Sequence, residues 1–312
     1  AALGLDTGRP VLVLTDDDNA ANRFAADLRG FAERDVVLLP SRELVMADVV
    51  GVSRGYEQRR LAALDELTEA HFAVASVQAA AQRTMPPEAL KAAIVSLATG
   101  ETAPLDELAQ SLTRAGYERC VQVEGTGQFS IRGGILDVFP PQAEHPYRVE
   151  FWDDEIDSIS TFDVGSQRRL EQCECLRCLP CMESIPALAK GGAAGLAKAV
   201  LALTSTRRKK QHADLQANLE RDAERLRETG SLPAADKYMP LIYPEMATAF
   251  DYLPENAAFP VKGYSISSQL HSVPACQSII KKAMVERMKA HYHREQFPED
   301  GVKYQVRFSL FK

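Results

Sequence analysis

Residues 126–169 read TGQFSIRGGILDVFPPQAEHPYRVEFWDDEIDSISTFDVGSQRR, and the order of apolar and polar residues in this stretch decides the fold that we predict around it. Side chains alternate between the two faces of a β-strand. Along residues 147–152, Val149 therefore points to one face, and Arg148 and Trp152 point to the other. This alternation predicts a strand with an apolar side that packs on a core and an outer side that carries arginine and tryptophan.

The same alternation predicts a strand over residues 128–137, with Phe129 on the core side and Arg132 on the outer side. Its two glycines, residues 133–134, allow a β-bulge or a close backbone approach. A proline-rich loop leads from this strand to the next, and the two aspartates at 153–154 are typical of a hairpin turn into a third strand. We therefore expect at least three antiparallel strands.

An exposed tryptophan beside two arginines is a composition that hot spots of protein interfaces favour, because both residue types combine a large contact area with directional hydrogen bonds. A half-buried tryptophan that packs on an arginine stem would give the same pattern, and the alternation leaves both interpretations open. The four acidic residues within 153–157 favour a solvated hairpin tip over a metal site, since no histidine or asparagine converges on them.

Three segments in a fixed order carry a resemblance to a known family. They are RGGILDVFP from Arg132, YRVEFWDDEID from Tyr147, and FD at Phe162 followed by SQR at Ser166. Over roughly forty residues they resemble the UvrB-like module of the bacterial transcription-repair coupling factor family, and more loosely UvrB itself. A match of this length and order is more specific than any short motif.

The resemblance implies a small, non-catalytic domain that binds UvrA and thereby links stalled transcription to nucleotide-excision repair. Arg132 and Arg148 match contact arginines of the family, and Trp152 occupies an aromatic contact position. The resemblance further implies that RNA polymerase and DNA are contacted only through parts of the parent protein outside this chain, and that this region needs no cofactor.

In the first ninety or so residues, predicted strands alternate with predicted helices, as in an α/β layer. Alternating strands and helices imply a parallel sheet with crossover connections; strands are predicted at 10–15, 36–40 and 72–77, and helices at 19–32 and 54–70. The three aspartates at 16–18 are interpreted as a turn that caps the next helix.

No segment supplies the G-x-x-x-x-G-K-[ST] loop of a nucleotide-driven motor, so we expect no ATPase and no enzyme. The resemblance implies a RecA-like remnant without a nucleotide site.

The predicted fold class is α/β, with a degenerate RecA-like parallel-sheet layer, an inserted small antiparallel-sheet α+β domain, a returning helical part and an incomplete α+β tail. The predicted boundaries are 1–93, 94–180, 181–258 and 259–312, and the resemblance covers about residues 1–258. Within the returning part, residues 201–229 are predicted as one long helix that ends at Gly230.

Length, composition and net charge limit the classes of protein to which this chain can belong. At 312 residues the length predicts roughly two domains, and 46% hydrophobic with 25% charged residues is ordinary for a globular protein. No apolar run approaches the roughly 18 residues that span a bilayer, so we expect no membrane association and a cytoplasmic location. The net charge of −7 argues against attraction of the whole chain to nucleic acid, and a local basic patch stays compatible with it.

Four of the six cysteines lie in the segment QCECLRCLPC, at Cys173, Cys175, Cys178 and Cys181. Such spacing is compatible with a zinc or iron-sulfur site if a loop folds around the metal. We favour structural cysteines and no metal, because residues 170–180 read as a strand that enters a proline and because cysteine packs as a small hydrophobe.

The last fifty residues do not continue the resemblance. Residues 261–283 resemble the THUMP region of bacterial RNA methyltransferases, so an alternative function is a truncated RNA-binding fragment fused to an unrelated module. Residues 276–292 have the apolar spacing of a helix, and its outer face carries Lys281 and Lys282 as possible RNA contacts. We favour a solvated charged face over RNA contacts for these lysines.

Overall fold

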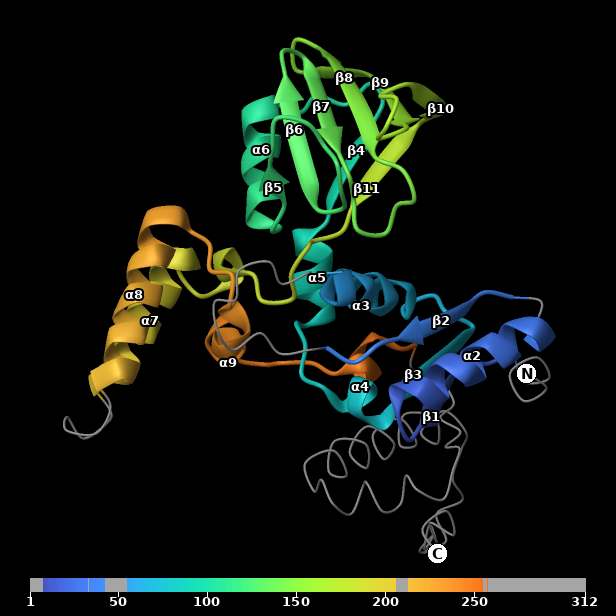
Figure 1. Ribbon diagram of the computed structural model, residues 1–312, viewed down its shortest axis with the longest axis vertical. Coiled ribbons are helices and arrows are strands. Elements are labelled where there is room, and N and C mark those ends of the chain that lie inside the picture. The colour runs from blue at the N-terminus through green and yellow to red at the C-terminus, as the bar shows by residue number, and fades with distance from the viewer. Residues whose placement is uncertain (1–7, 33, 43–54, 206–212, 255–256, 258–312) are drawn as a thin grey trace, which may run out of the picture. The chain divides into compact units, whose positions relative to one another are not determined.

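The computed structural model describes residues 8–32, 34–42, 55–205, 213–254 and 257 (Figure 1). Its mixture of parallel and antiparallel sheets confirms the predicted α/β class. The chain divides into two compact units. The parallel-sheet unit comprises residues 1–42, 63–83 and 248–312, and the antiparallel-sheet unit comprises residues 43–62 and 84–247. The four predicted domain boundaries stay a prediction.

Three fully parallel strands in the order β1-β3-β2 form the sheet of the parallel-sheet unit. They are β1 (Val11–Thr15), β2 (Val36–Leu39) and β3 (Phe72–Ser76), and each was predicted from its apolar run. The predicted crossover helix is α2 (Asp18–Ala32), which buries one stripe of small and apolar residues at helical spacing: Ala21, Ala25, Leu28 and Ala32. The short helix α4 (Val77–Ala81) follows β3 directly.

The aspartates after β1 lie at the carboxyl end of this parallel sheet. The Ala20 amide donates to Asp17 Oδ1 at 2.6 Å, which confirms the predicted helix cap. Asp18 Oδ1 accepts hydrogen bonds from the hydroxyls of Ser41, at 2.9 Å, and Ser76, at 2.5 Å. The Asp18 carboxylate therefore ties together the ends of β2 and β3.

The larger sheet belongs to the antiparallel-sheet unit and has the strand order β10-β9-β8-β7-β6-β5 (Figure 1). Its strands are β5 (Glu118–Arg119), β6 (Gln128–Arg132), β7 (Ile135–Val138), β8 (Tyr147–Trp152), β9 (Glu155–Phe162) and β10 (Arg169–Cys173). All neighbours are antiparallel except β5 and β6. A separate two-stranded sheet pairs β4 (Val95–Ala98) with β11 (Cys175–Cys178).

The prediction of one strand over residues 128–137 was wrong. The chain reverses at Gly133 and Gly134, so that β6 and β7 form a hairpin. Gly133 has a φ of 60°, in the left-handed region that glycine adopts without strain. A Cβ on Gly134 would lie 3.0 Å from the Phe151 carbonyl oxygen, which confirms the predicted close backbone approach. The predicted turn at residues 153–154 is also confirmed, since it joins β8 to β9.

The core of the antiparallel-sheet unit lies between one face of the six-stranded sheet and the helix α6 (Leu105–Arg114). Alternation along four neighbouring strands places their apolar side chains on this face, and each of the following is essentially inaccessible to solvent: Phe129, Leu136, Val149 and Ile159. Leu108 and Leu112 of α6, four residues apart, cover them. The predicted inward orientation of Phe129 and Val149 is therefore confirmed.

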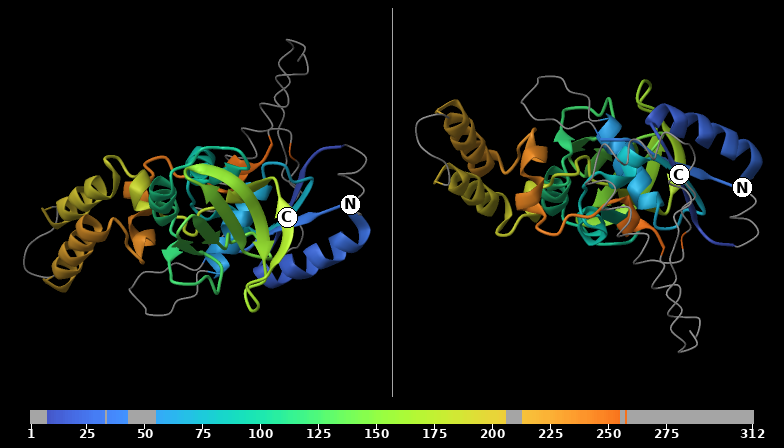
Figure 2. Two further views of the ribbon diagram at one scale, coloured as in Figure 1. Left: turned by 90° about the horizontal axis from the view of Figure 1, so that it is seen from above. Right: turned by 90° about the horizontal axis from the view of Figure 1, so that it is seen from below.

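The helix predicted over residues 201–229 is two helices, α7 (Gly192–Ser205) and α8 (Ala213–Thr229), which lie side by side in all three views (Figures 1 and 2). Both ends of the predicted stretch are helical, and helical periodicity alone does not register a reversal between them. Residues 206–212 lie outside the described residues. The predicted stop at Gly230 is confirmed, because its amide donates to the Leu226 carbonyl and its φ is 68°.

Six further elements complete the described chain: α3 (Gly55–Glu66), α5 (Pro87–Ala93), η1 (Pro186–Leu188), η2 (Ala235–Tyr238), α9 (Met239–Ile242) and η3 (Ala249–Tyr252). In this part of the chain no helix is both long and apolar enough to cross a membrane. The predicted tail, with its helix at 276–292 and with Lys281 and Lys282, falls outside the described residues.

Candidate protein-docking surface

The outer face of the six-stranded sheet, opposite the core, carries a buried carboxylate between two arginines. Asp137 of β7 pairs in register with Arg148 of β8, and Arg132 lies at the end of β6. Arg148 Nε donates to Asp137 Oδ1 at 2.7 Å, and the terminal nitrogens of Arg132 and Arg148 donate to Oδ2 at 2.7 and 2.9 Å. We call this arrangement the Arg132–Asp137–Arg148 triad.

The two arginines of the triad differ in exposure. The Arg148 side chain is 15% exposed, whereas the Arg132 side chain is 50% exposed and the Asp137 side chain only 1%. The Arg148 guanidinium lies 4.5 Å from the centroid of the Phe162 ring, and its hydrogen bonds to Asp137 raise its pKa. The prediction placed both arginines on the outer face, and the structure adds that Arg148 is largely covered there.

A tight loop between β9 and β10 covers Arg148. Hydrogen bonds within the loop shape it: the Gln167 amide donates to the Asp163 carbonyl, and both the amide and the hydroxyl of Ser166 donate to Asp163 Oδ1. Gln167 has a φ of 57°, and both its carbonyl and its side-chain oxygen accept from Arg148, at 3.4 and 3.3 Å. The loop therefore holds the guanidinium through both of its terminal nitrogens.

Trp152, the third predicted residue, ends β8 at the hairpin turn and is 81% exposed. Four residues along a strand separate it from Arg148, which corresponds to about 13 Å. This exposure contradicts the interpretation of a half-buried tryptophan packed on an arginine stem, and the role of Trp152 as a partner contact stays a prediction. Trp152 therefore presents a large apolar surface at one end of β8.

A second ion pair on the outer face joins Glu150 of β8 to Arg169 of β10, and the Ser158 hydroxyl donates to Glu150 at 3.1 Å. Arg169 lowers the pKa of the Glu150 carboxyl in the folded state. A lowered folded-state pKa contributes stability above the pKa of an unfolded glutamate, and this contribution disappears as the pH falls through the folded-state value.

The cysteine segment divides between two sheets, which differs from the single strand predicted over residues 170–180. Cys173 ends β10, and Cys175 and Cys178 lie in β11 with opposite exposure. Cys178 and Cys181 are each 1% exposed and belong to the apolar core, as expected for small hydrophobes. Among the described residues, no group of three or more His, Cys, Asp or Glu side chains has an arrangement that could hold a metal ion.

Thiol labelling of the native protein should separate two of these cysteines. Cys175 is exposed, whereas burial raises the pKa of the Cys178 thiol to about 12. Because the thiolate is the reactive form, a maleimide at mildly alkaline pH should modify Cys175 at least about 100-fold faster than Cys178. Trypsin cleaves after Arg177 and so places the two thiols on separate peptides for mass spectrometry. Labelling in urea should abolish the difference, and equal labelling in the native state would contradict the burial of Cys178.

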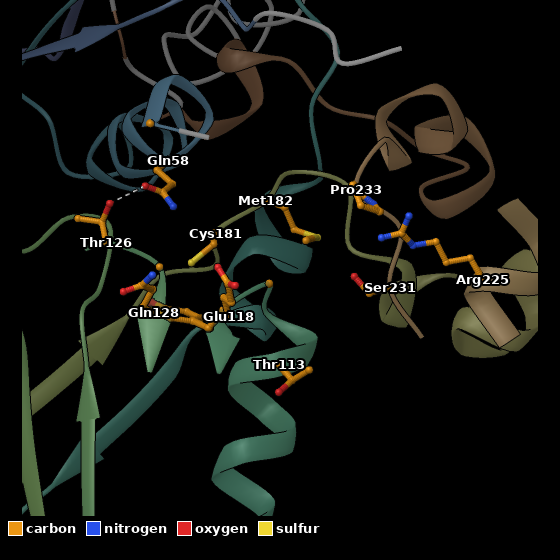
Figure 3. A pocket seen from close by; sticks show the side chains of 14 residues that line it. Gln58, Thr113, Glu118, Thr126, Gln128, Cys181, Met182, Arg225, Ser231 and Pro233 are labelled. Atoms are coloured by element: carbon orange, nitrogen blue, oxygen red, sulfur yellow. Dashed lines mark hydrogen bonds between the residues drawn. The ribbon is translucent and has the colours of Figure 1, made fainter. Parts of the chain in front are cut away.

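A cleft of about 610 Å³ also lies within the antiparallel-sheet unit (Figure 3). Its lining is rich in amide and hydroxyl groups, including Gln58, Gln128 and Thr126, and the Thr126 hydroxyl donates to the Gln58 side chain at 3.0 Å. The lining carries charges of both signs, Glu118 and Arg225. Neither the predicted arginines nor Trp152 line this cleft, so it is separate from the Arg132–Asp137–Arg148 triad.

Asp137 is the residue of this surface that sequence reasoning missed. It lies in the motif RGGILDVFP, in which only Arg132 was predicted to contact a partner. A signal was present, because Asp137 is the lone charged residue of a strand that is otherwise apolar. Its alternation relative to Leu136 also places it on the face of the arginines.

Comparison with known proteins defines the class of this region. Residues 95–183, which include the triad and Trp152, match the family model described as the UvrB interaction domain. The matched region is therefore an interaction domain.

The chain is homologous to a region of the transcription-repair-coupling factors. It is 34% identical over 266 residues to the Bacillus subtilis factor, covering 82% of this chain and 22% of the relative. It is 30% identical over 250 residues to the Haemophilus influenzae factor (80% and 21%) and 33% identical over 176 residues to the Escherichia coli factor (56% and 15%). The chain thus spans about a fifth of the length of the first two of these relatives. The resemblance of the tail to a THUMP region receives no support from these comparisons.

Proposed function

We propose that this chain is a non-catalytic interaction module of a transcription-repair-coupling factor, and that it recruits UvrA to stalled transcription for nucleotide-excision repair. The observation that carries the proposal is the position of the Arg132–Asp137–Arg148 triad and of the exposed Trp152 on one sheet, inside the region that matches an interaction domain. Exposed tryptophan and arginine are the residue types that most often dominate binding energy at protein interfaces.

Trp152 gives the most direct test, because it is so exposed that its removal costs little folding energy. Truncation of an interface tryptophan at a hot spot costs at least about 2 kcal/mol, or about 30-fold in Kd. We therefore expect Trp152→Ala to weaken UvrA binding by about that factor, measured by calorimetry with purified UvrA, and to leave thermal unfolding unchanged.

The chain offers a matched control for this substitution. Phe31 is 76% exposed and lies in α2 of the parallel-sheet unit, outside the region that matches the interaction domain. Phe31→Ala should bind UvrA like the wild type. Absence of UvrA binding by the wild type would remove the proposed function, and equal losses in the two variants would show that binding does not depend on this sheet.

A further inference from the structure

Two glutamine side chains direct their amide nitrogens into the cleft of the antiparallel-sheet unit (Figure 3). One of them is Gln128, whose Oε1 accepts hydrogen bonds from the backbone amides of Glu124 and Gly125 at 2.9 and 3.0 Å. Because the oxygen faces these two donors, the nitrogen of the same amide points away from them and toward the cleft. Among the described residues, no group accepts a hydrogen bond from this nitrogen.

Gln58 of α3 is the second of these glutamines, and it is only 8% exposed. Its Oε1 accepts from the Thr126 hydroxyl at 3.0 Å, which leaves the amide nitrogen as the group that faces the cleft. This nitrogen packs against Gly127 so closely that a Cβ there would lie 2.8 Å from it. Within the described part of the chain it has no hydrogen-bond partner. A buried donor without an acceptor costs free energy, so an acceptor that enters the cleft is stabilised there.

Opposite charges lie on the two sides of the cleft. Glu118 belongs to β5 and Arg225 to α8, and Figure 3 shows both side chains directed into the cleft from opposite sides. As far as the structure describes the chain, the Glu118 carboxylate makes no hydrogen bond and no ion pair. The ligand that complements this lining carries neutral carbonyl oxygens for the two amides, a basic group at one end and an acidic group at the other.

A polypeptide fits this lining better than a nucleotide does. Bases are typically recognised by stacking on an exposed aromatic face. Tyr117, the aromatic residue of the described lining, is 3% exposed, and its hydroxyl donates to the Leu179 carbonyl at 2.6 Å. The Glu118 carboxylate also repels phosphate. An extended peptide presents a carbonyl group about every 3.3 Å and carries side chains of both charges. The cleft volume of about 610 Å³ lies within the range of about 300–1,000 Å³ that is typical of ligand sites.

We propose that the cleft is a binding site for a short, extended peptide segment of another protein. Carbonyl oxygens of the peptide accept hydrogen bonds from Gln58 and Gln128. A basic group of the peptide faces Glu118, and an acidic group faces Arg225. The inference goes beyond the proposed function, because the cleft is separate from the candidate docking surface and no step of the argument involves UvrA.

The test measures the binding of synthetic peptides to the full chain by ligand-observed NMR titration. The peptides are acetylated and amidated, are about five residues long to suit the size of the cleft, and have glycine and alanine in the middle. In the mixed set, lysine stands at one end and aspartate at the other, in both orders. The comparison sets carry lysine at both ends or aspartate at both ends. We expect the mixed set to bind about fivefold more tightly than either comparison set, because it alone pairs with both charges of the cleft.

Two variants connect this binding to the cleft. Glu118→Lys should weaken binding of the mixed set by about fivefold and shift the preference to aspartate at both ends. Glu171→Lys is the matched control, because Glu171 is an exposed glutamate of β10, the strand at the other edge of the same sheet, and it should bind like the wild type. Gln58→Met keeps the length of the side chain without its amide and should weaken binding by about fivefold, the value of one hydrogen bond.

The inference is wrong if no peptide binds, if the mixed set has no advantage, or if Glu118→Lys binds like the wild type. Equal losses in Glu118→Lys and Glu171→Lys would show that the charge of the whole chain attracts the peptides, which also overturns it. If Gln58→Met does not fold, Glu118→Lys decides alone, because the Glu118 side chain is exposed and holds no other group. None of these measurements uses UvrA, so failure here leaves the proposed function standing, and absence of UvrA binding leaves this inference standing.

Discussion

Replacing Glu183 with glutamine is expected to lower the free energy of unfolding of the antiparallel-sheet unit by about 3–5 kcal/mol. Glu183 and Arg60 form an ion pair with 3.0 Å between Oε1 and Nε, and neither side chain is exposed to solvent. Glutamine keeps the hydrogen-bonding capacity of Glu183 but removes the negative charge that faces the buried Arg60 guanidinium, and the loss of this buried ion pair is the costly step. Urea unfolding followed by circular dichroism measures the change.

Hydrogen bonds to three neighbouring segments also fix the position of Glu183. Thr84 donates to its second carboxylate oxygen at 2.8 Å, its amide donates to Glu57 at 2.6 Å, and its carbonyl accepts from the Tyr243 hydroxyl at 3.0 Å. These bonds join α3, the segment after β11 and the end of α9. Burial also raises the pKa of the Tyr243 hydroxyl, so this group stays protonated and remains a donor.

Glu150→Gln is the matched control, because it removes the same charge from an ion pair at the surface. Glu150 and its partner Arg169 keep 28% and 51% of their side chains exposed. Exposed pairs contribute less than about 1 kcal/mol, so the unfolding midpoint of this variant should stay close to that of the wild type. Similar losses for the two variants would contradict the importance of burial for Glu183.

Much of the parallel-sheet unit could be predicted because its signals are local. The apolar runs of β1, β2 and β3 and the periodicity of α2 each lie within one short segment, and the parallel pairing follows from their alternation. The helix cap at Asp17 is likewise a contact over three residues. Tertiary packing agrees with local preference at each of these positions.

The predictions that were wrong depend on where the chain reverses. Residues 128–137 keep a plausible alternation through Gly133 and Gly134, and the two glycines suit a turn as well as a bulge. The prediction of one helix in place of α7 and α8 was wrong for the same reason, because the helical spacing of apolar residues does not show where the chain reverses. Which interpretation holds depends on partners distant in sequence, such as the Phe151 backbone against Gly134.

The candidate site shows the same division between local and distant information. Alternation alone places Arg132, Arg148 and Trp152 on the outer side, and their assignment as contacts comes from family resemblance. The difference between the two arginines needs the register of β6, β7 and β8, which brings Asp137 between them. It also needs the loop that carries Gln167, nineteen residues beyond Arg148 in the chain.

The second large effect is expected at Asp137. Asp137→Ala leaves the guanidinium of Arg148, 15% exposed, without its carboxylate, and should lower the free energy of unfolding by about 3–5 kcal/mol. Arg132→Ala removes the half-exposed partner of the same carboxylate and should cost less than about 1 kcal/mol. Urea unfolding of both variants under identical conditions provides the comparison.

A double variant separates the charge effect from packing. Asp137→Leu combined with Arg148→Met removes both charges and fills their space with apolar groups next to Phe162, and such replacements are often neutral for stability. We expect this variant to unfold close to the wild type and yet to bind UvrA more weakly, because it lacks Arg148, one of the two arginines proposed as contacts. Loss of UvrA binding by Arg148→Ala alone does not distinguish a lost contact from impaired folding. Wild-type affinity in this stable double variant would show that Arg148 does not contact UvrA.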